Sequence, residues 1–135
     1  MGAVRIGHGV RIAGNKEVIQ LVKDKGIFLE MCPTSNRQTK AVEEMSAYPL
    51  KKFLEMGLKI TLNTDDPAIE RTTLSREFRY MESLLNLTQE QKRLLLLNSV
   101  EAAFTSRNRK CKLKEQLFSE PYENYGEPII YKRIK

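Results

Sequence analysis

The sequence predicts an α/β fold in which parallel strands are joined by crossover helices, and three observations carry this prediction. Short apolar runs of strand length alternate with helical patterns over residues 3–62. Each apolar run leads directly into glycine or polar residues, and after residue 67 the pattern becomes helical only. Strands that alternate with helices favour parallel pairing through right-handed crossovers. We therefore expect about three parallel strands, followed by C-terminal helices.

The first strand is predicted over residues 3–6, and it leads into Gly7-His8-Gly9. A helix is predicted over residues 16–25, because Val18, Ile19 and Val22 recur at helical spacing. Asn15 is a residue type that caps helix N-termini, and Gly26 is a residue type that ends helices.

The second strand is predicted over residues 27–32, where Pro33 ends an apolar run. Residues 34–36 are polar and are expected to form a loop. A short helix is predicted over residues 50–55, and Gly57 follows it at the position where glycine commonly ends a helix.

The third strand is predicted over residues 59–62 and leads into Asn63-Thr64-Asp65-Asp66-Pro67. Phe78, Met81 and Leu85 then recur at helical spacing.

The remaining chain is expected to be mainly helical. Thr88 and Gln91 have the spacing of a capping box, which predicts a helix that carries Leu94–Leu97, Val100 and Phe104. A last helix is expected over residues 112–118, and residues 129–131 form a short β-prone segment.

Composition excludes several classes of protein. The chain has 135 residues, a formal charge of +6, two cysteines and one histidine. No apolar run approaches the ~18 residues of a membrane span, so no membrane partner is expected. Two cysteines are too few for a disulfide framework, which favours a reducing cytoplasm. One histidine is too few for a catalytic zinc site, which usually has three protein ligands.

The positive charge lies mostly near the C-terminus, where residues 105–135 carry eight Lys or Arg and four Glu. A solvated surface is the favoured explanation. A nucleic-acid partner is the less favoured one, since no aromatic residues alternate with these charges as they do in single-strand binders.

Polar residues at the strand ends are the candidate functional residues, because ligands bind at the C-terminal ends of strands in α/β folds. His8 could act as a general base or orient a water molecule, or it could be an ordinary surface residue. Asp65 and Asp66 could divide metal binding and substrate binding between them. Alternatively, Asp66 could simply cap a helix that begins at Pro67.

Two further residues near the second strand end have less specific signals. Cys32 could be a nucleophile activated by His8, but a buried free cysteine is more often part of the core. Glu30 could reach the same site or form an ion pair inside the fold.

Taken together, the three strand ends resemble the last three motif-bearing strands of the adenosine deaminase family. The matching segments are Arg5–Gly9, Glu30–Asn36 and Leu62–Pro67, in that order. The helical segment that carries Asn98 and Phe104 is similar to the end of that domain. The family consists of (β/α)₈ barrels, so the resemblance implies that residues 1–135 are the C-terminal part of a TIM barrel whose N-terminal strands are absent.

The resemblance also implies a role for each candidate residue. Enzymes of this family use one zinc ion to polarise the water that attacks C6 of adenosine, which yields inosine and ammonia. By this resemblance, His8 is the catalytic residue that orients the attacking water and helps to deprotonate it. Asp65 is the metal ligand, and Asp66 binds the substrate at N7 of the purine. Ser35 and Asn36 match a family loop and are given a structural role.

The family pattern also contains residues that this sequence lacks. These are a zinc-binding His-x-His pair, a third zinc histidine and a glutamate that protonates the purine. Zn²⁺ would therefore find one ligand of four here, so we expect the isolated chain to have negligible activity and weak zinc affinity. Open sheet edges also predict self-association, or dependence on a separately made N-terminal half.

Other functions remain open at this point. The chain could be a catalytically dead interaction or regulatory fragment of the same fold. Within the deaminases, adenine or adenosine monophosphate could replace adenosine or deoxyadenosine as the substrate in purine metabolism.

Overall fold

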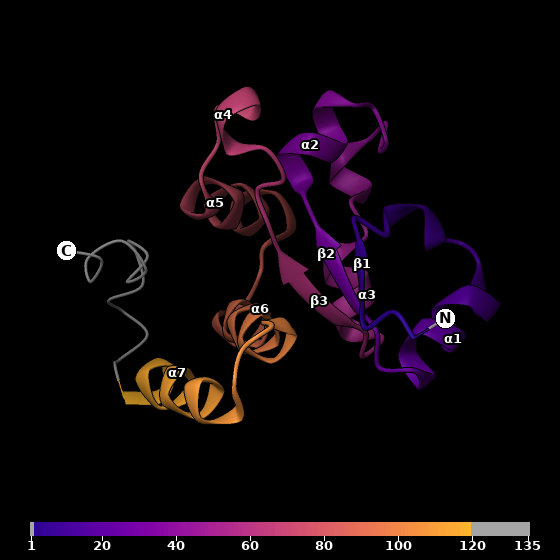
Figure 1. The fold of residues 1–135 in the computed structure, drawn as a ribbon. Helices are drawn as coiled ribbons and strands as arrows, with labels where there is room; N and C mark the ends of the chain where they lie inside the picture. The colour runs from indigo at the N-terminus through magenta and orange to yellow at the C-terminus, as the bar shows by residue number, and fades with distance from the viewer. Residues whose placement is uncertain (1, 120–135) are drawn as a thin grey trace.

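A computed structural model describes residues 2–119 of the chain and shows one parallel sheet with helices around it (Figure 1). The three strands are β1 (Arg5–Gly7), β2 (Phe28–Met31) and β3 (Lys59–Leu62). They are parallel and adjacent in chain order, β1-β2-β3. This arrangement confirms the expected α/β fold with three parallel strands.

The helices follow and connect these strands. They are α1 (Lys16–Asp24), α2 (Pro33–Gln38), α3 (Leu50–Glu55), α4 (Pro67–Glu70), α5 (Leu74–Leu85), α6 (Gln89–Ala102) and α7 (Arg107–Ser119), with 3₁₀ turns η1 (Val10–Ile12) and η2 (Met45–Ala47). Helices α2, α4 and α5 lie beyond the C-terminal ends of the strands, α6 lies beside β3, and α7 lies beside α6 (Figure 1).

The predicted helix ends are confirmed where the chain supplies its own caps. The Asn15 side chain accepts a hydrogen bond of 3.1 Å from the backbone N–H of Val18 at the start of α1. Gly26 follows that helix with φ of 61°, a conformation that glycine adopts without steric cost. Thr88 and Gln91 form the predicted capping box of α6.

Four predictions at element ends are corrected or not covered. Phe104 is not carried by the helix that starts after Thr88, because α6 ends at Ala102 and the backbone of Ala103 is extended. Residues 34–36 are not a loop but part of α2, because Pro33 occupies the first turn of a helix rather than merely ending a strand. Helix α7 begins at Arg107, earlier than the expected residue 112. The expected strand at residues 129–131 lies outside the described residues.

The two faces of β2 differ in burial, and β3 shares the buried face. Leu29 and Met31 of β2 and Ile60 and Leu62 of β3 share one face and are at most 2% exposed. They form a core with residues of the covering helices such as Phe53. Phe28 and Glu30 point to the other face and are only half-buried. In the described part of the chain, no helix is long and apolar enough to cross a membrane.

Candidate active site

The C-terminal ends of all three strands open on one cleft with a volume of about 580 Å³. His8 reaches it from β1, Cys32 from β2 and Asp65 from β3. In parallel α/β folds this edge is where ligands bind. The cleft therefore brings together two of the three predicted site residues, His8 and Asp65.

His8 occupies a tight turn between two glycines. Its own φ is 59°, and the following Gly9 has φ of 71°. A Cβ atom at Gly9 would lie 2.7 Å from Cδ2 of the buried Leu29, so this position requires glycine for space as well as for conformation. The His8 backbone N–H donates a hydrogen bond of 2.8 Å to the carbonyl of Glu30, which fixes the turn against β2.

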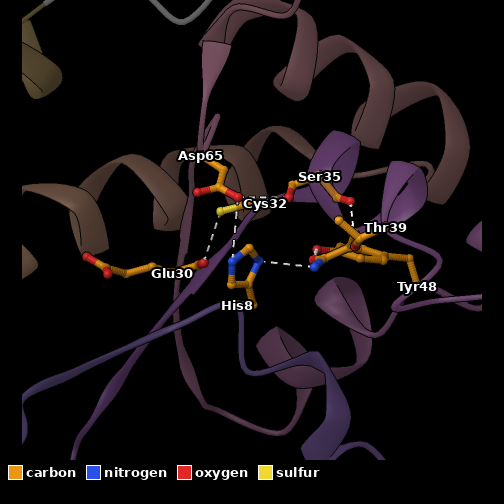
Figure 2. A network of polar contacts seen from close by, with 8 residues as sticks. His8, Glu30, Cys32, Ser35, Thr39, Tyr48 and Asp65 are labelled. Carbon is orange, nitrogen blue, oxygen red and sulfur yellow. Dashed lines mark hydrogen bonds and ion pairs between the residues drawn. The ribbon is translucent and has the colours of Figure 1, made fainter. Parts of the chain in front are cut away.

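Asp65 faces His8 across the cleft (Figure 2). Its Oδ2 lies 3.6 Å from Nε2 of His8, and the two side chains are 45% and 40% exposed. The same oxygen accepts a hydrogen bond of 2.8 Å from Oγ of Ser35 on α2. Asp65 also has a left-handed backbone, with φ of 63°. The carboxylate is thus aimed at the cleft by its backbone and by a hydroxyl donor.

A second residue of α2 contacts the other side of the His8 ring. Nδ2 of Asn36 lies 3.1 Å from Nδ1 of His8. The Tyr48 hydroxyl donates a hydrogen bond of 2.8 Å to Oδ1 of Asn36. The structural role expected for Ser35 and Asn36 therefore takes a specific form, because each contacts one of the predicted site residues. Tyr48 carries no local sequence signal of this contact, since it lies in an irregular segment.

Asp66 is placed differently. Its Oδ1 accepts a hydrogen bond of 3.1 Å from the backbone N–H of Ile69, and it caps α4 with Pro67 in the first turn. The alternative that Asp66 is a helix cap is therefore confirmed. Asp66 is exposed and does not line the cleft around His8 and Asp65.

The environment of Cys32 does not support a nucleophile. Burial, followed by the negative charges of Asp65 and other nearby carboxylates, raises the pKa of the Cys32 thiol to about 12. The protonated Sγ donates a weak hydrogen bond of 3.3 Å to the carbonyl of Glu30. Glu30 is among the residues that line the cleft, and its carboxylate forms an ion pair with Arg5 at 3.0 Å. In Figure 2 this carboxylate points away from His8 and Asp65, so the ion pair is the role that the structure shows.

Glu77 is a buried residue that the sequence prediction missed. Its side chain on α5 is fully buried, and its oxygens accept hydrogen bonds from the Thr34 backbone N–H at 3.1 Å and the Thr72 hydroxyl at 2.5 Å. The carboxylate thus holds the start of α2. A signal was present, because Glu77 lies four residues before Met81 on the apolar stripe of its helix.

The chain is similar to known proteins over most of its length. A family model described as adenosine deaminase matches residues 1–120. The chain is 44% identical over 115 residues to an adenosine deaminase of Clostridium botulinum (strain 657 / Type Ba4), which covers 85% of this chain and 35% of the relative. The chain therefore spans about a third of the length of the curated relatives it matches.

Solved structures agree with this similarity. An adenine deaminase from Arthrobacter aurescens matches with a TM-score of 0.81 and 30% identity, covering 84% of this chain and 35% of that one. The N6-methyl-AMP deaminase from Arabidopsis thaliana matches with a TM-score of 0.80 and 25% identity, covering 90% and 36%. A Burkholderia ambifaria amidohydrolase described with bound Zn matches with a TM-score of 0.74 and 25% identity, covering 84% and 32%.

Proposed function

The chain belongs to the adenosine deaminase family, and on this premise we propose that it is the part of a zinc-dependent deaminase barrel that carries His8 and Asp65. The complete protein would hydrolyse adenosine or deoxyadenosine to the inosine product and ammonia. The observation that carries the proposal is the pairing across the cleft, with Nε2 of His8 3.6 Å from Oδ2 of Asp65 at the ends of different strands.

The residues present fit one part of a zinc site. The Asp65 carboxylate is a suitable oxygen ligand, is half-exposed on the cleft and is held by Ser35. Among residues 2–119, no group of three or more His, Cys, Asp or Glu side chains could hold a metal ion. Asp65 would therefore contribute a ligand to a site completed by other segments. When bound, Zn²⁺ would lower the pKa of a water molecule toward ~7.

Residues of this chain would orient the water molecule and bind the purine. His8 would orient the water that attacks the purine, since its Nε2 faces the same space as the Asp65 carboxylate. The purine-binding role that the resemblance implies for Asp66 is kept in this proposal, and it requires the carboxylate to turn from its place at the start of α4 toward the cleft. In the balanced reaction, the water oxygen adds to C6 of the purine, one of its protons goes to N1 and the other to the amino nitrogen, the bond from C6 to that nitrogen breaks, and ammonia leaves.

Adenosine is the proposed substrate because the 44% identical relative is named an adenosine deaminase, whereas the adenine deaminase is only 30% identical. A cytoplasmic location is part of the same proposal. It is supported by the two cysteines, which are both free thiols.

Complementation would test this proposal. The 135-residue chain is mixed with the N-terminal two-thirds of the Clostridium relative and Zn²⁺, and the absorbance change of adenosine is followed. Neither part alone should convert adenosine, and the mixture should. Asp65→Asn should abolish activity, whereas the matched Asp24→Asn on the exposed face of α1 should not.

Two results would overturn the proposal. Absence of activity in a mixture that demonstrably forms a complex would favour the inactive regulatory fragment. Faster conversion of adenine or adenosine monophosphate than of adenosine would overturn the substrate assignment.

A further inference from the structure

The imidazole of His8 lies between two polar groups that can determine which of its nitrogens carries hydrogen. Nδ1 lies 3.1 Å from Nδ2 of Asn36, and Nε2 lies 3.6 Å from Oδ2 of Asp65. A neutral imidazole donates from one nitrogen and accepts at the other, so its hydrogen-bond partners select the tautomer. The orientation of the Asn36 amide is therefore decisive.

Tyr48 fixes that orientation. Its side chain is buried, with 3% exposure, and burial raises the pKa of its hydroxyl, which therefore keeps its hydrogen. A buried hydroxyl needs an acceptor for that hydrogen, and the structure supplies Oδ1 of Asn36 at 2.8 Å. The amide oxygen consequently faces Tyr48, and the NH₂ group faces His8.

Asn36 has little freedom to move away from this arrangement. It is 2% exposed, its backbone N–H donates to the Cys32 carbonyl at 2.9 Å, and its carbonyl accepts from Ala41 at 2.9 Å. The preceding turn of α2 is held by the buried Glu77 through Thr34. The amide therefore reaches His8 from a fixed backbone.

We propose that Tyr48 and Asn36 are positioning residues that hold neutral His8 in the tautomer with hydrogen on Nε2. Nδ1 accepts the hydrogen bond from the Asn36 amide, and the N–H at Nε2 points toward the cleft in front of Asp65. The consequence of this tautomer for catalysis rests on the proposed function. In the proposed reaction, His8 would donate a hydrogen bond from Nε2 to the water oxygen and orient it, instead of accepting a proton at that nitrogen.

The single histidine of the chain makes a direct test possible. The full chain is labelled with ¹⁵N in histidine only, and the ring nitrogens are assigned by long-range ¹H–¹⁵N correlation. The measurement is made at pH about 8.5, roughly two units above the ordinary histidine pKa of ~6.5. The wild-type chain should show the hydrogen on Nε2, and a hydrogen on Nδ1 would overturn the proposal.

A neutral imidazole in water already favours the Nε2–H form modestly, so variants provide the decisive comparison. Asn36→Asp replaces the donor that faces Nδ1 by an acceptor of the same shape and should move the hydrogen to Nδ1. Tyr48→Phe removes the hydroxyl that orients the amide and should bring the two ring-nitrogen shifts closer together. Tyr80→Phe removes a hydroxyl outside this network and should leave both shifts unchanged.

Unchanged ring-nitrogen shifts in both Asn36→Asp and Tyr48→Phe, with dispersed amide spectra that show intact folds, would overturn the proposal. If one variant fails to fold, the wild-type chain and the other variant still decide. The readout requires neither zinc nor substrate. Failure of the complementation assay with the expected tautomer would thus refute the proposed function alone, and the wrong tautomer in an active complex would refute this inference alone.

Discussion

Two residues of the candidate site, His8 and Asp65, have left-handed backbone conformations that side chains rarely adopt, with φ of 59° and 63°. Such conformations cost of order 1–3 kcal/mol and persist only where the surrounding structure enforces them. Here the enforcing contacts include the backbone hydrogen bond from His8 to β2 and the Ser35 hydroxyl bound to Asp65. Both side chains are thereby held over the same cleft.

At Asp65 this strain predicts that glycine is a more stable replacement than alanine, which is the reverse of the usual order. Asp65→Gly and Asp65→Ala both remove the carboxylate, but only alanine keeps a Cβ atom at φ of 63°. We expect Asp65→Gly to be more stable than Asp65→Ala by about 0.5 to 1 kcal/mol, because relief of the left-handed strain exceeds the larger unfolded-state entropy of glycine. Urea denaturation measures the difference.

The same pair at Asp24, in the last turn of α1, is the control for the glycine effect. There alanine should be more stable than glycine, as in ordinary helices. An Asp65→Ala chain at least as stable as Asp65→Gly would show that the backbone at this position is not strained.

The two cysteines should react very differently with iodoacetamide. A pKa of about 12 reduces the thiolate fraction of buried Cys32 about a thousandfold at neutral pH, whereas Cys111 is exposed. Mass spectrometry of the native chain at pH about 8 should find the label on Cys111 only, and unfolding in urea should expose both thiols. Rapid labelling of Cys32 in a folded Cys111→Ser chain would contradict the described environment.

At the residue scale, the sequence predicts which side chains gather but not how they are aimed. His8 and Asp65 could be placed because both follow strands whose ends meet at one edge. Their left-handed backbones, and the contacts of Asn36 with His8 and Tyr48, depend on neighbours that are distant in sequence. Local patterns do not contain that information.

At the scale of elements, α2 supports the site although it is only six residues long. It supplies Ser35 to Asp65 and Asn36 to His8, so a small displacement would affect both sides of the cleft. The N-terminus of α2 is held by the Glu77 carboxylate of α5. The position of α2 therefore depends on a buried acceptor from another helix.

Replacement of Glu77 should lower the free energy of unfolding, and the loss should grow with the number of hydrogen bonds that the replacement removes. Glu77→Ala leaves the Thr34 N–H and the Thr72 hydroxyl without their acceptor and leaves a cavity, and we expect a loss of about 3 to 5 kcal/mol. Glu77→Gln keeps one acceptor oxygen and should lose about 1 to 2 kcal/mol. Chemical denaturation followed by circular dichroism measures both losses.

Glu82→Ala on the same helix is the matched control. The Glu82 side chain is 43% exposed and pairs with Lys92, so its loss should cost less than 1 kcal/mol. Equal losses for Glu77→Ala and Glu82→Ala would contradict the assigned role of the buried carboxylate.

The same helix shows why one element could not be predicted. Helices α1 and α6 carry their own caps, Asn15 and Thr88, so their starts follow from local sequence. The residue preceding α2 is Cys32, whose side chain makes no capping hydrogen bond. The backbone N–H of Thr34, in the first turn of α2, instead donates to the carboxylate of Glu77, which lies 43 residues further along the chain. The local sequence therefore contains no cap, and the polar sequence of α2 resembles a loop.

At the scale of the whole molecule, the sheet is covered unevenly. One face buries Leu29 and Ile60 completely, whereas Phe28 and Glu30 on the other face are half-buried. Within residues 2–119, β1 pairs only with β2, so its other edge is open. The alternation of strands and helices predicted the parallel order, but the degree of coverage follows only from the packed helices.

An open edge next to apolar side chains predicts self-association of the isolated chain. Val4, immediately before β1, is 55% exposed. In sedimentation velocity we expect association that increases with concentration, and Val4→Lys should shift the chain toward monomer because edge lysines oppose pairing.

The matched control is Leu21→Lys on α1, where the leucine is similarly exposed at 53%. This substitution should leave the association unchanged. A wild-type chain that sediments as a monomer at all concentrations, or equal effects of both lysines, would contradict association through the β1 edge.

The adjacency of the three strands in chain order has a consequence for protein engineering. His8, Asp65 and the residues that hold them, from Asn36 and Tyr48 to Glu77, all lie within one continuous stretch of sequence. This stretch could be exchanged between homologous barrels as a cassette without separating the candidate site residues from their supports. A graft of the strand ends alone would leave the supports behind, and its side chains would have the right identities in the wrong orientations.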